Sequence, residues 1–547
     1  MTTAPPAPLH PTTDVVDEYE ADVAIVGYGP VGALLALQLA QQGHRVVAVD
    51  RWLAPYTLPR AVTYDHEIAR ILATLGIDSD DDPAIERHPE TYYWKNAAGQ
   101  TLLEVDWGSD NASGWATRYW FYQPELEERL RAMAAEYDEV TLLRGFLVDE
   151  LTQDDDGATI RGLRAHGDGE VQPTRVRAKY VVGCDGANSF VRDSQGMAYE
   201  DHGYFFDWLI LDMVPTVDRE WSPTHWQLCD PTRPTTIVPG GPGRRRWEFM
   251  ALPGEQPSEL ASPERAWSLL EPWGVTPDNA TLERSAVYRF QARWSQDWRA
   301  GRALIAGDAA HLMPPFAGEG MCAGVRDAIA LGWRLDLVLR GIADDALLDS
   351  YGTERTEHVR RYVEFSMELG KIICITDPAE AAERDASMIA EMENYDGTPV
   401  NTDIGTLGPG LCVEGDAHSG ELAHQGVVEA GGRRGRFDDV VGRGWILIGL
   451  DENPWDVVTP QQRQALARLD ATAVRVGAPG SDAEVVDVDG VFAAWLGDIK
   501  ARYVVLRPDF YVAATATDRD HLRASLDTLL GRLHLTPQAA ALAEATR

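Results

Sequence analysis

The first ordered stretch of the chain carries three glycines at fixed spacing between an expected strand and an expected helix. The apolar run Ala21–Val26 predicts the strand, and the Ala- and Leu-rich run Val31–Gln42 predicts the helix. The motif Gly27-x-Gly29-x-x-Gly32 lies between them, and an acidic residue closes the next predicted strand. Such glycines permit a tight turn and close approach of a pyrophosphate, while the acid accepts ribose hydroxyls. The pattern predicts a β-α-β unit that binds a dinucleotide through Gly27, Gly29, Pro30, Val31, Gly32, Asp50 and Arg51.

Length and charge restrict the class of protein. The chain has 547 residues, and because single hydrophobic cores stop growing at roughly 250–300 residues, two or three domains are expected. The 86 acidic and 49 basic residues give a formal net charge of -37, which repels phosphate backbones and anionic lipid headgroups. Nucleic acids and membrane surfaces are therefore not expected as partners.

Cysteine usage and the N-terminal residues indicate a location. The cysteines are odd in number and never spaced as a metal-binding or dithiol pair, which predicts reduced thiols, a cytoplasmic location and no metal site. Residues 1–19 lack the basic start and apolar run of a secretion signal, and they predict a flexible tail. The five cysteines are Cys184, Cys229, Cys322, Cys374 and Cys412.

Changes in composition and periodicity along the chain predict the domain boundaries. After a Trp-rich, Pro-punctuated region of short strands, Ala303–Ala306 returns to a buried-strand pattern, so the first domain is expected to be discontinuous. Helices are predicted at Arg118–Glu136, Ala323–Leu339 and Glu364–Met392. The predicted division is a tail (1–19), a first domain (20–200 plus 290–395), an antiparallel-sheet domain (201–289), a Gly-rich connector (396–435) and a small α/β domain (436–547).

Two further motifs and one loop follow the glycine pattern in order. The first is Cys184-Asp185-Gly186-Ala187-Asn188-Ser189 with Val191-Arg192, and the second is Ala306-Gly307-Asp308-Ala309-Ala310-His311. The loop runs from Met313-Pro314-Pro315-Phe316 to Gly324-Val325-Arg326-Asp327. Together they resemble the Asp-Gly motif, the Gly-Asp motif and the flavin loop of the flavoprotein aromatic hydroxylases, which are class A FAD-dependent monooxygenases. The likeness is strong over 20–360 and departs from the commonest pattern at Asp50 and Glu319.

The resemblance implies a fold and a set of cofactor contacts. The fold is α/β, with a discontinuous Rossmann-like FAD-binding domain, an interleaved antiparallel-sheet substrate domain and a C-terminal thioredoxin-like domain. Independently of the name, Asp308 after a buried strand can accept bonds from ribityl hydroxyls, and glycines ahead of a helix expose N–H donors suited to reduced flavin. Further FAD contacts implied are Arg60, Gln123, Asp185, Gly186, Arg192, Gly307, Asp308, Pro315, Gly318, Gly320 and Met321.

Within the family, the segments around Thr235–Gly240, Arg244–Met250 and Val287–Phe290 look most similar to the 3-(3-hydroxyphenyl)propionate hydroxylase branch. This branch implies hydroxylation of a phenolic acid ortho to its hydroxyl, with NADPH or NADH, molecular oxygen and a C4a-hydroperoxyflavin. The three consecutive arginines at 244–246 equally fit a solvated strand edge. Predicted catalytic residues are Pro314, Pro315 and His311, and predicted substrate contacts are Tyr204, Trp226, Tyr288 and Phe316.

Other interpretations of the sequence stay open at this point. A larger phenolic polyketide or antibiotic is the alternative substrate, since related enzymes accept these. An NAD-dependent dehydrogenase leaves the motifs at Asp185 and Asp308 without a function, and a non-enzymatic flavin-binding scaffold is the third alternative. The C-terminal stretch Val505–Ala513 matches the thioredoxin-like domain of larger hydroxylases, yet no cysteine follows Cys412, so a dithiol function is excluded. A homodimer is compatible with the sequence.

Overall fold

The computed structural model describes residues 17–167, 169–394 and 405–537. Most of the expected tail at 1–19 and part of the expected connector lie outside these ranges. Two compact units make up the chain. Unit 1 comprises Met1–Thr57, Glu127–Ala198 and Asp297–Ala310, and unit 2 comprises Leu58–Leu126, Tyr199–Gln296 and His311–Arg547.

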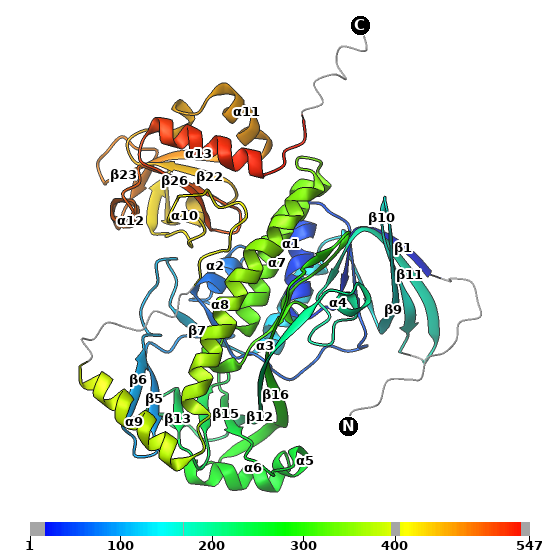
Figure 1. Ribbon diagram of the computed structural model, residues 1–547, viewed down its shortest axis with the longest axis vertical. Helices are drawn as coiled ribbons and strands as arrows, with labels where there is room; N and C mark the ends of the chain where they lie inside the picture. The colour runs from blue at the N-terminus through cyan, green and yellow to red at the C-terminus, as the bar shows by residue number, and fades with distance from the viewer. Residues whose placement is uncertain (1–16, 168, 395–404, 538–547) are drawn as a thin grey trace. The chain divides into compact units, whose positions relative to one another are not determined.

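Unit 1 is built on a sheet whose central strands are parallel (Figure 1). Its apolar β-branched strands form the core, with Val23, Ile25 and Val182 fully buried. The helix α1 (Pro30–Gln41) follows β1 as the glycine motif predicts, and α4 (Phe190–Ser194) follows β11. The strand order is β17 (Arg299–Ala300), β18 (Ala303–Ile305), β11 (Val171–Gly183), β1 (Asp17–Val26), β2 (Val46–Asp50) and β8 (Val140–Arg144), with β9 (Phe146–Asp154) and β10 (Gly157–Ala165) as a hairpin beside β11.

Unit 2 contains an eight-stranded sheet that is antiparallel except where β13 pairs with β5. One face carries Leu209, Leu211 and Trp247 and packs against α5 (Pro257–Leu260) and α6 (Pro263–Leu270). The opposite face carries Trp208, which contacts the Phe316 ring. The order is β19 (His311–Leu312), β16 (Ala280–Ser295), β12 (Tyr199–Pro215), β15 (Arg245–Met250), β14 (Thr235–Pro239), β13 (Trp226–Cys229), β5 (Tyr92–Asn96) and β6 (Thr101–Val105).

Two helix predictions need correction. The stretch Arg118–Glu136 is a strand followed by a helix, because Gln123-Pro124 starts α3 and the preceding aromatic residues pair in a sheet. The stretch Glu364–Met392 is the end of α8 and the whole of α9, because Asp377 caps a new helix and Pro378 has no N–H to continue the old one. The elements are β7 (Arg118–Phe121), which lies between β3 (Thr63–Asp65) and β4 (Ile85–Glu86), with α2 (His66–Ala73), α3 (Gln123–Ala134), α7 (Gly320–Leu339), α8 (Asp349–Ile373) and α9 (Pro378–Glu393).

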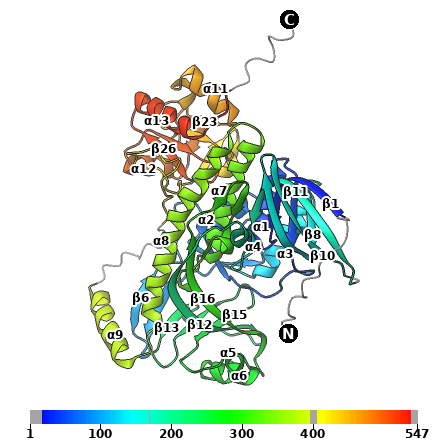
Figure 2. The same ribbon diagram turned by 45° about the vertical axis from the view of Figure 1, so that its right-hand side comes forward.

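The helices α7 and α8 lie side by side in both views (Figures 1 and 2). The C-terminal part of unit 2 packs on them, since Trp333 and Leu337 of α7 share a core with Trp445 and Leu529. Short 3-10 helices occur at Glu271–Trp273, Gly307–Ala309, Pro315–Ala317, Asp345–Leu348 and Pro454–Asp456. Within the described ranges, none of the helices has the length and apolar character needed to cross a membrane.

The C-terminal sheet begins earlier than expected. Val427–Ala430 and Arg433–Arg436 form β20 and β21 within the stretch expected to be a connector, because Val428 joins the core around Phe437 and Val476. The sheet order is β21, β20, β24 (Val485–Asp487), β23 (Thr472–Gly477), β22 (Ile446–Gly449), β25 (Tyr503–Leu506) and β26 (Val512–Ala516), with helices α10 (Phe437–Val440), α11 (Pro460–Arg468), α12 (Val491–Asp498) and α13 (Arg519–Arg532).

Candidate cofactor and substrate site

The parallel sheet of unit 1 brings three sequence motifs to one edge. Neighbouring strand ends are joined by backbone bonds: Gly27 N–H donates to Val49 at 2.8 Å, Cys184 N–H to Val26 at 2.7 Å, and Ala306 N–H to Gly183 at 3.0 Å. The carboxyl ends of parallel strands are where open α/β sheets bind ligands. The glycine motif, the Asp185 segment and the Asp308 segment therefore meet at the expected edge.

Glycine is required where these segments touch. Gly27 has a φ of 98°, and a Cβ built on it would lie 2.3 Å from the Cys184 carbonyl oxygen. A Cβ at Gly29 would meet nothing within 4 Å, so the backbone there faces open space. Gly29 is also the N-cap of α1 and offers no side chain to the first amides of the helix. The positive end of the helix dipole and its N–H donors are thus left for an anionic ligand.

Acidic and basic side chains fix these loops. Asp50 accepts the Tyr28 N–H at 3.1 Å and the Trp52 N–H at 2.8 Å, so this carboxylate also shapes the turn around the glycine motif. Asp185 accepts the Ser189 hydroxyl at 2.5 Å and the Val191 N–H at 3.1 Å, and burial raises the pKa of this carboxyl. Asp185 therefore orders its own loop.

Arg192 links the two motifs that follow the glycines. Its Nη1 donates to the Ala187 carbonyl at 3.1 Å and to the Ala309 carbonyl at 3.2 Å, and the residue is buried. Gly307 contributes to the same junction, since a Cβ there would lie 3.1 Å from a Val31 methyl. Unit 1 therefore holds Asp308 close to the start of α1.

In unit 2, the turn at Arg60 is held by buried polar side chains. Gln123 Oε1 accepts the N–H groups of Arg60 and Ala61, each at 2.8 Å. Arg246 donates to the carbonyls of Pro59 and Arg60, also at 2.8 Å each, and pairs with Asp212. Gln123 thus braces the turn that presents Arg60, which is a second role beside its predicted contact with the cofactor.

The loop before α7 is held by a buried ionic cluster. Arg118 Nη2 donates to the Ala317 carbonyl at 3.0 Å and also contacts the Glu319 carboxylate. Arg326 donates to the other Glu319 oxygen at 2.9 Å. Burial nevertheless raises the pKa of Glu319 to about 7, with the nearby Asp65 carboxylate adding to the effect. Glu319 is one of the two positions at which the sequence departs from the commonest pattern of the family that it resembles, and the residue here is titratable.

Two donors of Arg118 are left over. Nε and Nη1 are buried and have no hydrogen-bond partner in the described protein, and Nη1 lies 3.6 Å from the position of a Cβ on Gly318. Because a buried unpaired donor costs free energy, such groups normally meet an acceptor. They therefore suit an electron-rich acceptor placed against the Gly318 backbone.

His311 makes a buried hydrogen bond to a carboxylate. Its Nε2 lies 2.7 Å from Asp327 Oδ2, and Asp327 Oδ1 accepts from Arg355 Nε at 2.8 Å. All three side chains are almost fully buried. This geometry supports a positioning role at the strand that precedes Pro314 and Pro315, while a catalytic role for His311 stays a prediction.

The predicted substrate residues do not all share one surface. Tyr288 pairs with Trp208 across β16 and β12, and the Phe316 ring lies 5.5 Å from the Trp208 ring, so these residues share a face. Trp226 lies on the opposite face, where it packs edge-on against Trp273 at 5.6 Å, because alternate residues of a strand point to opposite sides. The side chain of Tyr204 lies outside the described part of the structure.

A small aromatic cavity adjoins Phe316. Its walls include Tyr92, Trp94, Trp107, Phe316 and Phe365 of α8. The Tyr92 hydroxyl accepts from Gln227 Nε2 at 2.6 Å. The cavity is a candidate part of a site for an aromatic ring. Tyr92 of β5 was not identified from the sequence, because strands with alternating aromatic residues are also typical of ordinary core. Trp107 follows β6 and belongs to no periodic pattern that could have identified it.

Arg245 and Arg246 do not fit the solvated strand edge that the sequence left open for the run at 244–246. A solvated strand edge was the alternative, yet Arg245 and Arg246 are both buried and point to opposite faces of β15. On the Trp208 face, Asp212 pairs with Arg246 and Arg284, and Glu248 lies 3.7 Å from Arg246. The alternation Arg246-x-Glu248 within a strand was the signal that could have placed both on one face.

Comparison with known proteins agrees with these motifs. A family model described as FAD binding domain matches residues 20–366, and one described as HcaD C-terminal domain matches residues 420–531. The chain is 35% identical over 519 residues to a probable NADH-specific resorcinol 4-hydroxylase of Rhodococcus jostii (strain RHA1), which covers 94% of this chain and 96% of that protein. It is 30% identical over 553 residues to the 3-(3-hydroxy-phenyl)propionate/3-hydroxycinnamic acid hydroxylase of Escherichia coli (strain K12), covering 96% and 97%.

Solved structures show the same fold. The flavin-dependent monooxygenase PieE, crystallised with FAD and substrate, aligns with a TM-score of 0.79 at 22% identity and covers 95% of this chain and 100% of that one. Aklavinone-11 hydroxylase, crystallised with FAD and aklavinone, aligns with a TM-score of 0.75 at 24% identity with the same coverage. At this identity the likeness concerns the fold alone.

Proposed function

Because the chain belongs to the FAD-dependent aromatic hydroxylases, we propose that it adds one oxygen atom to the ring of a small phenol, next to or opposite an existing hydroxyl. The reaction consumes molecular oxygen and a reduced nicotinamide, and the NADH specificity in the name of the Rhodococcus relative favours NADH over NADPH. The observation that carries the proposal is the meeting of the glycine, Asp185 and Asp308 motifs at one edge of the unit 1 sheet.

The residues of unit 1 fit the nucleotide part of FAD. The open N-terminus of α1 suits the pyrophosphate, with Gly29 leaving room and Val31 and Gly32 offering N–H groups. Asp50 keeps lone pairs for ribose hydroxyls in addition to the two amides it accepts, since a carboxylate has about four acceptor sites. Asp308 is assigned to the ribityl hydroxyls, and Arg51, Gly186 and Arg192 complete this set.

The residues of unit 2 fit the flavin ring, which is the part of FAD that accepts electrons. Arg118 provides two buried donors that have no partner among the described residues, and the N-terminus of α7 at Gly320 and Met321 has no side-chain cap there. Both would stabilise the negative charge that reduced flavin carries on its N1 and C2-oxygen side. Arg60, Gln123 and Gly318 are assigned to cofactor contacts in the same unit.

Bound FAD would take up two electrons from the nicotinamide and pass them to oxygen. This chemistry is needed because ground-state oxygen reacts slowly with a closed-shell phenol. The protein has to orient the ring and exclude water. We assign these tasks to Pro314, Pro315 and Phe316, because two prolines stiffen the loop and Phe316 is 3% exposed against Trp208.

The charges on the Trp208 face favour a neutral substrate. Arg246 and Arg284 are both committed to Asp212 and to the carbonyl of Pro59. Glu248 accepts no hydrogen bond from the described residues, and burial raises the pKa of its carboxyl. A buried carboxylic group accepts or donates a bond to a phenol hydroxyl but repels a second carboxylate. We therefore place resorcinol-like phenols ahead of the phenolic acids suggested by the sequence segments at 235–250.

Substrate-stimulated oxidation of the nicotinamide tests this proposal. The purified protein should be supplied with FAD, NADH or NADPH, and either resorcinol or 3-(3-hydroxyphenyl)propionate. We expect faster NADH consumption with resorcinol and a product heavier by one oxygen atom. Stimulation by the phenolic acid alone would overturn the substrate assignment, and stimulation by neither compound would leave the larger polyketide phenols as the class to test.

The finer architecture is also a proposal. We infer that 20–200 plus 290–395 form the FAD-binding domain, that 201–289 form the core of the substrate domain, and that the C-terminal domain, whose sheet begins at Val427, is thioredoxin-like. Support for the last comes from the pairing of β22, which is parallel to β23 and antiparallel to β25, with α11 and α13 packed together beside it. The five free cysteines support a reducing, cytoplasmic location.

A further inference from the structure

The turn that joins β25 to β26 extends beyond its own sheet and is buried by other elements of unit 2. Arg507, Asp509, Phe510 and Tyr511 are each at most 4% exposed. Phe510 has a φ of 68°, a conformation that non-glycine residues rarely adopt unless their surroundings impose it. The Arg70 guanidinium of α2 lies over the Phe510 ring at 4.4 Å. The C-terminal domain thus inserts this turn among the helices of unit 2.

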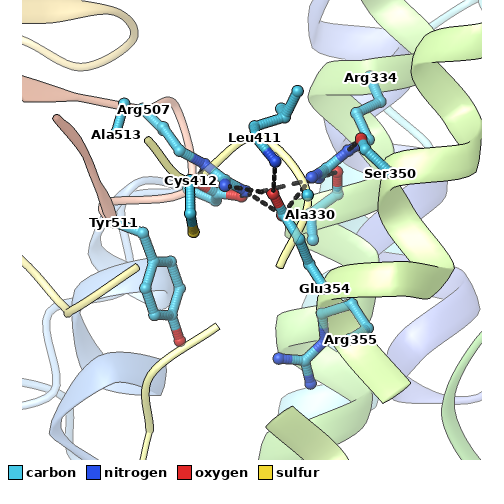
Figure 3. A network of polar contacts seen from close by, with 12 residues as sticks. Ala330, Arg334, Ser350, Glu354, Arg355, Leu411, Cys412, Arg507, Tyr511 and Ala513 are labelled. Atoms are coloured by element: carbon cyan, nitrogen blue, oxygen red, sulfur yellow. Dashed lines mark hydrogen bonds and ion pairs between the residues drawn. The ribbon is translucent and has the colours of Figure 1, made fainter. Parts of the chain in front are cut away.

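The first half of the turn is locked by a charge cluster (Figure 3). Glu354 of α8 accepts two bonds from Arg507, at 2.9 and 2.8 Å, and also contacts Arg334 of α7. Asp509 accepts from Arg507 and, at 2.9 Å, from the Trp333 indole. Two arginines face two carboxylates, so the cluster is neutral and holds the turn against α7 and α8.

The second half of the turn begins a relay of buried side chains. The Tyr511 hydroxyl donates to Glu67 Oε1 at 2.8 Å. The other Glu67 oxygen accepts from Arg326 Nε at 2.5 Å. Tyr511 is 2% exposed, and Glu67 and Arg326 are each 3% exposed, so these bonds are shielded from water. Each is therefore worth more than a comparable surface contact.

The relay ends on the loop that carries the predicted flavin and ring contacts. Arg326 Nη1 donates to Glu319, Glu319 also contacts Arg118, and Arg118 Nη2 donates to the Ala317 carbonyl at 3.0 Å. All of these residues belong to unit 2. One side chain of the C-terminal domain is therefore linked by hydrogen bonds alone to the backbone of segment 313–320.

We propose that Tyr511 is a positioning residue through which the C-terminal domain holds segment 313–320 in its working conformation. The functional part of this proposal rests on the proposed function, because that function assigns the segment to the flavin and the ring. Without the Tyr511 hydroxyl, Glu67 Oε1 becomes a buried acceptor lacking its donor and draws more strongly on Arg326. Glu319 and Arg118 then lose part of their anchor, and the Ala317 carbonyl is freed.

Hydrogen exchange on the purified full-length chain without added cofactor tests the structural part. In Tyr511→Phe we expect amides of 313–320 to exchange about tenfold faster, the size expected from losing one buried bond to a charged acceptor. The matched control is Tyr503→Phe, since Tyr503 donates to Glu452 at 2.5 Å within the same domain and lies outside the relay. Its 313–320 amides should exchange at the wild-type rate.

The FAD-loaded enzyme gives the second measurement. We expect Tyr511→Phe to release several times more hydrogen peroxide per NADH consumed than wild type or Tyr503→Phe, because a loose loop admits water. Unchanged exchange at 313–320 in Tyr511→Phe, or equal acceleration in both variants, would overturn the proposal. If wild type shows no substrate-stimulated NADH oxidation, the proposed function fails while the exchange result still decides the relay.

A second variant keeps the proposal testable if Tyr511→Phe folds poorly. Glu67→Gln keeps an acceptor for Tyr511 but removes the charge that holds Arg326. It should accelerate exchange at 313–320 as Tyr511→Phe does, while the β25–β26 turn itself exchanges at the wild-type rate. Acceleration confined to that turn would contradict the relay.

Discussion

Arg192 donates a hydrogen bond to the carbonyl of Ala309, 117 residues further along the chain, at 3.2 Å. The same nitrogen also donates to the Ala187 carbonyl, so one guanidinium joins the Asp-Gly and Gly-Asp segments of unit 1. Arg192 therefore holds together the two motifs on which the family resemblance depends.

Replacing Arg192 should weaken FAD binding. In Arg192→Ala both carbonyls lose their donor, and because bonds from charged donors are worth about 1.5–3 kcal/mol, FAD affinity should fall at least about tenfold. Fluorescence quenching on titration of FAD into apoprotein measures this. A lysine cannot reproduce the fork, so Arg192→Lys should rescue little. Wild-type affinity in the alanine variant would contradict the linkage.

Glu319 should make stability depend on pH. The pKa of this carboxyl is about 7 in the folded protein against an ordinary value of 4.5, so between these values the folded state holds a proton that the unfolded state has lost. Its contribution is complete below pH 4.5 and is lost as pH rises to about 7, by about 1–3 kcal/mol.

The variant Glu319→Gln removes this titration. Comparison of Tm between pH 5 and pH 8 should show a smaller decrease in the variant than in wild type. An identical decrease in both proteins would show that Glu319 is ionised throughout and that Arg118 and Arg326 outweigh its burial.

Glu248 should select the substrate. In Glu248→Gln the charge disappears while the shape remains, so kcat/KM for resorcinol should fall about tenfold and any activity on 3-(3-hydroxyphenyl)propionate should rise. Glu104→Gln is the control, because Glu104 pairs with Tyr93 in the row of Trp226, on the opposite face of the same sheet. Equal effects of both substitutions would remove Glu248 from the site.

Gln123 should stabilise the Arg60 turn. Gln123→Ala leaves two N–H groups, those of Arg60 and Ala61, without their acceptor, and a loss of about 1–3 kcal/mol in the free energy of unfolding is expected. Urea denaturation measures this loss. A loss of FAD affinity with unchanged stability would instead assign Gln123 to the cofactor alone.

The sequence predicted local units well where one short pattern determines them. The glycine motif between β1 and α1 is such a case, because a Cβ on Gly32 would clash with the carbonyl oxygen of Gly27, a few residues earlier in the chain. The helices at 118–136 and 364–392 were less accurate, because aromatic pairing of β7 and the cap at Asp377 depend on neighbours that periodicity does not report.

Only the part of the site that the cofactor motifs form could be predicted from the sequence. Residues such as Asp185 and Asp308 belong to short motifs that can be recognised in the sequence. The roles of Arg118, Glu248 and Tyr511 depend on contacts with residues of other segments, which the sequence does not reveal. Trp226 was misplaced for the same reason, since its strand gives alternation but not which face meets Phe316.

FAD titration into the apoprotein of wild type and Asp308→Ala tests the central assignment most directly. Wild type should bind FAD stoichiometrically and show the visible flavin bands, while Asp308→Ala should stay largely colourless because the ribityl hydroxyls lose their acceptor. A wild-type protein without flavin absorbance in excess FAD, or an Asp308→Ala variant that retains FAD normally, would contradict it.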